Sequence, residues 1–243
     1  ILGTTLYFIS TLLAFRGMNK GEKRLEMNQE SFSSSFINGL KLLFQVRVLL
    51  GIMLITLIYN LWAFPFVSMI PVIGKEILSL SPFEVGILAS SEGLGALTGA
   101  FLILSYGRVI HYRKLYVLGT TISIFMAMCF SHASQFFVGI IFLFLSGIGA
   151  GFFSAMQSTL VIMCSPKDLR TRMMGLLTMF IGLATLGFIQ IGSLANWLGA
   201  QNAILICSIE GLFVLILVVR FIPEILHLQQ SSQETFLSSG APR

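Results

Sequence analysis

Charged side chains are scarce in this sequence. Lys, Arg, Asp and Glu together make up 10% of its 243 residues, whereas a typical soluble domain carries about 25%. Apolar residues take up 56% of the chain and include 22 Phe. Because a water-facing surface needs more charge than this, the composition excludes an ordinary soluble domain and favours a chain surrounded mainly by lipid.

Cysteine and histidine are also sparse, which limits the chemistry that the chain can carry. The three cysteines, Cys129, Cys164 and Cys207, lie singly in apolar segments, and the three histidines are far apart. None of them has the spacing of a metal site. Neither a Walker A sequence nor a G-x-S-x-G motif occurs, so no ATPase domain or serine hydrolase is predicted. We expect no metal, no cofactor and no enzymatic activity.

Long apolar runs are what the chain has in quantity. Crossing about 30 Å of hydrocarbon takes roughly 20 apolar residues in a helix, and six runs of about this length follow one another. Only the second and the sixth contain a carboxylate, Glu92 and Glu210 respectively. The predicted spans are 48–73, 85–106, 115–130, 136–164, 173–197 and 203–221. The sequence therefore predicts an all-α, multi-pass membrane protein.

Shorter segments flank this predicted bundle of residues 48–222. Residues 1–15 are apolar but would form a helix of only about 22 Å, so we interpret them as a truncated transmembrane helix. Residues 16–47 are polar, and their second half, SFINGLKLLFQVRVLL, has apolar residues at the spacing of an amphipathic surface helix. Residues 223–243 are a polar tail that we expect to be disordered.

The positions of the basic residues predict an orientation. Every Lys and Arg except Lys75 falls in loops 16–47, 107–114 and 165–172 or in the tail from residue 220. By the positive-inside rule these segments are cytoplasmic. The basic residues therefore point to membrane lipids and not to nucleic acid as a partner. The loop residues expected to anchor or gate the cytoplasmic ends of the helices are Arg108, Arg113, Lys114, Arg170 and Arg172.

Glycine is unevenly distributed among the predicted spans. It is frequent in the second, fourth and fifth spans and rare in the third and sixth. Small residues let helices approach closely in lipid, so we expect the glycine-rich spans at the centre and the other two at the periphery. Each glycine-poor helix then closes a triplet. Two triplets form a 3+3 inverted repeat, the arrangement of many secondary transporters.

Three stretches carry a family resemblance: SLSPFEVGILASSEGLGALTGAFLI, YGRVIHYRKLYVLG and SPKDLRTRMMGLLTMFIGLATLGFIQIGSLANWLGAQNAI. They resemble the eighth helix, the basic loop after it, and the eleventh helix with its preceding loop in transporters of the major facilitator superfamily. Over nearly its whole length the chain is similar to the C-terminal half of such a transporter, closest to drug:proton antiporters and enterobactin-exporter-like members. The basic loop lacks the family's acidic residue, so the usual gating salt bridge is not carried over.

This resemblance implies a partner and a location. A six-helix N-terminal half of the same transporter would be missing from this chain, which would explain the truncated first helix. The expected location is the plasma membrane, in bacteria the inner membrane. The resemblance also implies a small-molecule substrate, moved by alternating access.

Glu92 is the first candidate for proton coupling. It shares a helix face with small residues, about 11 Å from the outer end of its span. An ionisable residue inside a membrane is a functional candidate by default, and a carboxyl in a cavity that alternately wets and dries can exchange a proton. The alternative is a protonated side chain that bonds to a neighbouring helix. Glu210 is a second, weaker candidate.

Five further polar residues are candidates for lining a substrate cavity. Tyr59, Asn60 and Trp62 precede Phe64-Pro65, where a break in the helix would free backbone carbonyls. The resemblance makes this span a cavity liner. Each of the two glutamines inside later spans can contact substrate or make an interhelical hydrogen bond; they are Gln157 and Gln190.

The sequence thus predicts a secondary active transporter. We expect proton-coupled efflux of a small amphiphilic or siderophore-like molecule. An importer of a small solute, and a scaffold or sensor that uses the same fold without transport, are the open alternatives.

Overall fold

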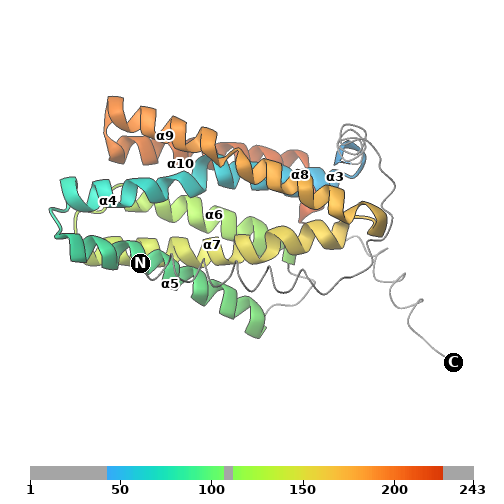
Figure 1. Cartoon of the computed structure of the whole chain (residues 1–243), viewed down its shortest axis with the longest axis horizontal. Helices are drawn as coiled ribbons and strands as arrows, with labels where there is room; N and C mark the ends of the chain where they lie inside the picture. Colours follow the sequence, from blue (N-terminus) through green and yellow to red (C-terminus); the bar gives the residue numbers. More distant parts are fainter. Residues whose placement is uncertain (1–42, 107–111, 227–243) are drawn as a thin grey trace, which may run out of the picture. The chain divides into compact units, whose positions relative to one another are not determined.

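The computed structural model describes residues 43–106 and 112–226 (Figure 1). The chain divides into two units after Ser35, and every described residue belongs to the second unit. The predicted truncated helix 1–15, most of loop 16–47 and most of the tail 223–243 lie outside the described residues, as does Arg108.

In the described part of the chain all regular secondary structure is helical, and six helices are long and apolar enough to cross a membrane. The second, third, fourth and sixth are α5 (Pro82–Tyr106), α6 (Tyr112–Phe130), α7 (Phe136–Cys164) and α10 (Ala200–Phe221). The fifth consists of η5 (Lys167–Leu169), α8 (Arg170–Gly182) and α9 (Ala184–Leu198). The six predicted spans and the fold class are confirmed.

The first span is continuous but changes helix type along its length. It runs through α3 (Arg47–Ile58), η1 (Tyr59–Ala63), η2 (Phe64–Met69), α4 (Ile70–Val72) and η3 (Ile73–Ile77). The η1 turn is a π-helix and η2 is a 3₁₀-helix. Pro65 has no N–H to give to the carbonyl of Leu61 four residues earlier, which explains why regular α-helix stops here. The predicted break is therefore a change of helix type.

The packing of the helices repeats in two triplets. The second span, α5, packs along the fourth, α7, and in the same way α9 of the fifth span packs on the first span. The third span, α6, packs on α7, and the sixth, α10, packs on the first span. Exchanging first with fourth, second with fifth and third with sixth thus reproduces these contacts, as a 3+3 repeat requires. The contact between α9 and α10 has no counterpart of similar extent between α5 and α6.

Glycine allows the closest of these contacts. A Cβ atom on Gly95 would collide with the carbonyl of Phe144, and one on Gly147 would collide with the carbonyl of Glu92. In the other triplet, a Cβ on Gly187 would collide with the carbonyl of Leu61. The backbones of α5 and α7, and of α9 and the first span, therefore touch directly at these points.

Within the described residues, the expectation that the glycine-rich spans are central fails for the second and fifth spans but holds for the fourth. Over an 18-residue apolar stretch of each span, buried positions make up 39% in the third and fourth spans and 33% in the sixth, but only 22% in the second and fifth. The reason is that the second and fifth spans use only some of their glycines in contacts, whereas a Cβ on any of the four glycines of α7 would meet a neighbouring atom. A Cβ would meet nothing within 4 Å at Gly86 and Gly93 of α5, nor at Gly175, Gly182 and Gly192 of the fifth span.

Buried apolar side chains form two separate cores. The basic-end core lies where α3, α6 and α8 begin; it includes Ile52, Tyr116 and Leu176. The far-end core includes Phe66, Ile191 and Ile204. Among the described residues only Trp62 packs against both cores, so this side chain marks the level at which one core gives way to the other.

The glycine contact predicts a position-specific loss of stability. Gly95→Ala forces the α5 and α7 backbones apart and is expected to lower the free energy of unfolding by about 1–3 kcal/mol. Gly93→Ala, two residues away on an open face, is the matched control and should be neutral or slightly stabilising. Denaturant titration of the two variants in the same detergent measures the difference. Equal stability of both would contradict the packing described here.

Candidate functional site

Glu210 lies at the centre of a hydrogen-bonded cluster that joins three spans. Its Oε2 atom accepts a hydrogen bond from Trp62 Nε1 at 2.9 Å and another from Gln190 Nε2 at 2.6 Å. Trp62 belongs to η1, Gln190 to α9 and Glu210 to α10. Three residues that the sequence suggested separately are therefore brought together.

This cluster explains how each of its members is tolerated inside the membrane. The indole N–H and the amide N–H₂ both need an acceptor when buried, and a carboxylate needs donors. Two donors on one oxygen hold the carboxyl group in a fixed orientation. For Gln190 the structure shows the interhelical hydrogen bond that was one of its two predicted roles.

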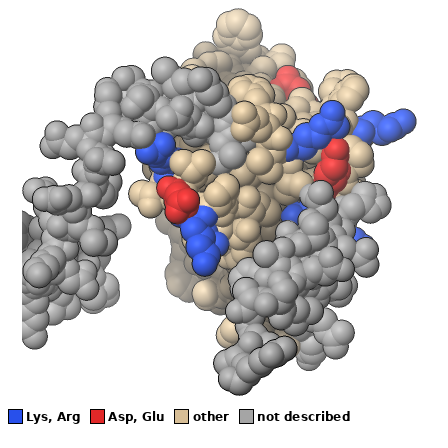
Figure 2. All heavy atoms as spheres, turned by 90° about the vertical axis from the view of Figure 1, so that its right-hand side faces the viewer, with Lys and Arg blue, Asp and Glu red and all other residues tan. Residues whose placement is uncertain are grey.

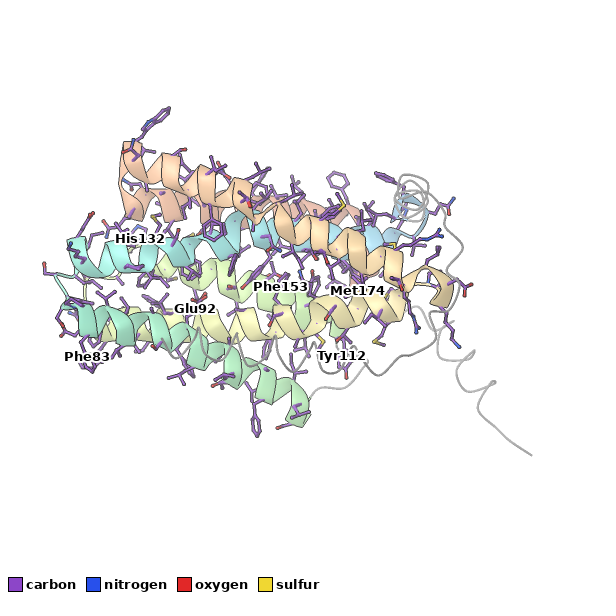
Figure 3. The ribbon with its side chains drawn as sticks, viewed as in Figure 1. Phe83, Glu92, Tyr112, His132, Phe153 and Met174 are labelled. Atoms are coloured by element: carbon purple, nitrogen blue, oxygen red, sulfur yellow. The ribbon has the colours of Figure 1, made fainter. Side chains whose placement is uncertain are left out.

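Glu92 is in a contrasting environment. It is half-buried on α5, and it accepts no hydrogen bond from any residue that the structure describes. Neither of its carboxylate oxygens is among the completely buried side-chain atoms that lack a partner. Figure 3 shows Glu92 and Phe153 about midway between the two ends of the bundle. Its backbone carbonyl, in contrast, is fixed against Gly147.

Two of the predicted cavity residues are packed between helices. Tyr59 is 7% exposed and its ring stacks on Phe153, with centroids 3.7 Å apart. Phe153 in turn stacks on Tyr116 of α6. Asn60 is 5% exposed and its Nδ2 donates to the carbonyl of Thr56 at 2.8 Å. Tyr59 thus joins the first span to α7, whereas the Asn60 side chain bonds within its own span. Their contact with substrate stays a prediction.

Tyr59 is nonetheless close to the free carboxylate. Its hydroxyl is near Ser123 of α6, and Glu92 is close enough to act on it electrostatically. Ser123 Oγ is also 3.4 Å from Ser146 Oγ of α7.

Gln157 is the remaining cavity candidate. It is half-buried on α7, and its Nε2 atom is buried without a hydrogen-bond partner among the described residues. Leaving a buried donor unpaired costs about 1–3 kcal/mol. An acceptor brought by a bound molecule would remove that cost.

The basic end of the bundle is tied together by a residue that the sequence reading did not single out. Arg47 at the start of α3 forms an ion pair with Glu224 of η6 (Pro223–Ile225), with Nη1 and Oε1 3.1 Å apart. Arg113 at the start of α6 donates to the Glu224 carbonyl at 3.3 Å and to Cys164 Sγ at 3.7 Å. The sequence signal that could have identified Glu224 is its position just after the last span, at the end of the bundle that is rich in arginine.

Charge and apolar contact both hold η6 in place. Hydrogen bonding to its own backbone N–H, followed by the Arg47 guanidinium, lowers the pKa of Glu224 below its usual value. Ile225 is fully buried, and a Cβ on Gly51 would lie 3.0 Å from its Cδ1 atom. Charged side chains gather on this end of the bundle, which faces the viewer in Figure 2.

The other predicted loop residues lie at the same end. Lys114 is exposed, whereas Arg170 and Arg172 are half-buried at the start of α8. The Nε atom of Arg170 is buried without a partner among the described residues. Within residues 43–106 and 112–226, no group of three His, Cys, Asp or Glu side chains could hold a metal ion.

Comparison with known families identifies the fold. The family model of the Major Facilitator Superfamily matches residues 48–240, which include all six spans. The chain belongs to the Major Facilitator Superfamily. A search of curated proteins found no match to it. Members of this superfamily are membrane transporters, so membership supports a transporter built from a six-helix half.

The Glu210 cluster predicts a measurable coupling between two side chains. In a double-mutant cycle of Trp62→Phe and Glu210→Ala, we expect a coupling free energy of about 0.5–1.7 kcal/mol, the range of interhelical hydrogen bonds in membranes. Unfolding titrations of the four proteins give this quantity. Trp197→Phe replaces the other tryptophan, which is 82% exposed, and should show no coupling to Glu210→Ala. A zero value for Trp62 would refute the cluster.

Proposed function

We propose that the chain is one half of a proton-coupled secondary transporter that exports a small amphiphilic or siderophore-like molecule by alternating access. Membership of the superfamily supports the transport function. The observation that carries the coupling proposal is the difference between the two carboxylates inside the membrane: Glu210 is held by two donors, whereas Glu92 has no described donor.

The physical argument rests on what a carboxyl group must do to carry a proton. It must reach water on one side, lose its proton, and become neutral again before it is enclosed, because an enclosed charge is costly. A carboxylate fixed by two donors is stabilised in its charged form, and protonation weakens both hydrogen bonds, so it is poorly suited to the task. Glu92 is half-buried and no described donor fixes its carboxylate, so it suits the requirement better, and the nearby Tyr59 hydroxyl offers a partner during exchange.

Gln157 supports the proposal for the substrate. Its unpaired amide donor lies in a span made almost entirely of apolar and small residues. A ligand that matches such surroundings is mostly apolar and has at least one hydrogen-bond acceptor. An amphiphilic molecule has this character.

The uncovered side of α5 supports a second six-helix half as the partner. Seven of its exposed or open positions recur at alternating spacings of four and three residues: Phe83, Ile87, Ser90, Leu94, Leu97, Phe101 and Leu104. Such a stripe is typical of a helix that packs against another helix at a small angle. We therefore propose that the N-terminal half covers this face.

The basic end is proposed to lie in the cytoplasm. Arg47, Arg113 and Arg170 lie there, while Lys75 lies at the opposite end of the first span. The positive-inside rule supports this orientation in the plasma membrane, or in bacteria the inner membrane. Headgroups of anionic lipids would then contact these arginines.

Neutralising Glu92 should uncouple transport from protons. We expect Glu92→Gln, expressed from the chain's own locus, to lose at least about 90% of pH-gradient-driven dye movement while its membrane level stays normal, because an amide cannot carry a proton. Fluorescence of a lipophilic cation and of a pH indicator in everted vesicles measures both fluxes.

The matched control is Glu84→Gln at the start of the same helix. Glu84 is a capping-box residue that bonds to Ser81, and glutamine can fill this role, so its fluxes should match those of the wild type. If Glu92→Gln also keeps both fluxes, Glu92 serves packing alone. Proton-independent import, or normal folding with no flux in wild type, would favour the importer or the scaffold instead.

A further inference from the structure

The fifth span consists of two segments that pack on different parts of the bundle. Its first segment, α8, contacts α3 and α7 and adds Met173, Leu176 and Leu177 to the basic-end core. Its second segment, α9, contacts η1, η2 and α10 and adds Ile191 to the far-end core. The boundary between the two cores therefore falls within this span.

The junction between the two segments is an irregular point in the span. Leu183 lies outside both helices, and its N–H donates to the Met179 carbonyl at 3.3 Å, a long bond for a helix. Gly182 and Leu183 are both exposed, and a Cβ on Gly182 would meet nothing within 4 Å. Two hydrogen bonds cross the junction, from Leu186 N–H to the Leu183 carbonyl at 3.0 Å and from Thr185 Oγ1 to the Gly182 carbonyl at 3.2 Å. No packing against Gly182 adds to them in fixing the angle between α8 and α9.

The α9 segment, in contrast, is fastened on two sides. Gly187 lies directly against the carbonyls of Asn60 and Leu61, in the part of the first span where the helix type changes. One turn further on, Gln190 is bonded to Glu210, and Glu210 also holds Trp62, the side chain shared by both cores. All these contacts lie within α9, η1 and α10, and none reaches α8.

We propose that Glu210 is the positioning residue of a hinge in the fifth span. Its carboxylate fastens α9 to η1 and α10, so that α8 turns about Gly182–Leu183 against a fixed neighbour. Glu210 would act through Gln190 and Trp62 and would touch no substrate. The sixth span, which carries Glu210, would then hold α9 in place in addition to packing on the side of the bundle.

Two distances measured by pulsed electron paramagnetic resonance test this inference on the full chain in lipid nanodiscs. Spin labels at Ile216 on α10 and Ser193 on α9 report the fastened segment, and labels at Ile216 and Thr171 on α8 report the hinged one; all three positions are exposed. The native cysteines are replaced by alanine. No substrate is needed, so the result does not depend on the proposed transport function.

Without further substitutions, we expect a narrow distribution of distances between the labels at Ile216 and Ser193 (the α9 pair). The distances between the labels at Ile216 and Thr171 (the α8 pair) should be more widely distributed. Glu210→Leu should widen the α9 distribution about twofold, because the interhelical hydrogen bonds are lost, whereas Glu210→Gln keeps an acceptor for both donors and should leave it narrow. Gly182→Ala continues the helix without a clash and should narrow the α8 distribution alone.

Two results would overturn the inference. One is an α9 distribution that stays narrow in Glu210→Leu, since the carboxylate would then not hold the segment. The other is an equal response of both pairs to every variant, which is the behaviour of general loosening and not of a hinge. If Glu210→Leu lowers the yield of folded protein, Glu210→Gln still distinguishes loss of the specific hydrogen bonds from general loosening, because a narrow α9 distribution in this variant indicates that the acceptor oxygen is what holds α9.

Discussion

Gly147 of α7 lies against the backbone carbonyl of Glu92 on α5, and Gly95 of α5 lies against the carbonyl of Phe144 on α7. In lipid the hydrophobic effect does not hold helices together, so association depends on van der Waals contact and internal polar bonds. Such contact needs residues without side chains at the crossing point. The arrangement of the second and fourth spans, and by the repeat that of the first and fifth, follows from this requirement.

The same contact connects packing to the proposed chemistry. Because the backbone of Glu92 is fixed against Gly147, its side chain has a defined starting position even though no described donor holds the carboxylate. Glu210 is the opposite case, since its carboxylate is fixed by Trp62 and Gln190. Under the proposed function, the spans thus contain one carboxylate for proton exchange, Glu92, and one that holds helices together, Glu210.

Much of this fold could be predicted from the sequence, because the lipid environment imposes a simple pattern. Runs of apolar residues predicted all six spans, and Pro65 predicted the irregular part of the first. The contacts were harder to predict: Trp62 and Glu210 are 148 residues apart, and no local pattern indicates that they meet. Gly95 and Gly93 look alike in the sequence, yet only Gly95 meets a neighbouring backbone.

The central claim is that the Glu92 carboxyl is free and that the Glu210 carboxyl is held. Labelling of the chain in native membranes with dicyclohexylcarbodiimide, which forms a stable adduct with accessible protonated carboxyls in the membrane, tests it directly. Peptide mass spectrometry gives the labelling rate at each site. The account predicts modification of Glu92, with Glu210 reacting only after Trp62→Phe and Gln190→Leu remove its donors. Faster labelling of Glu210 than of Glu92 in the unaltered chain would contradict it.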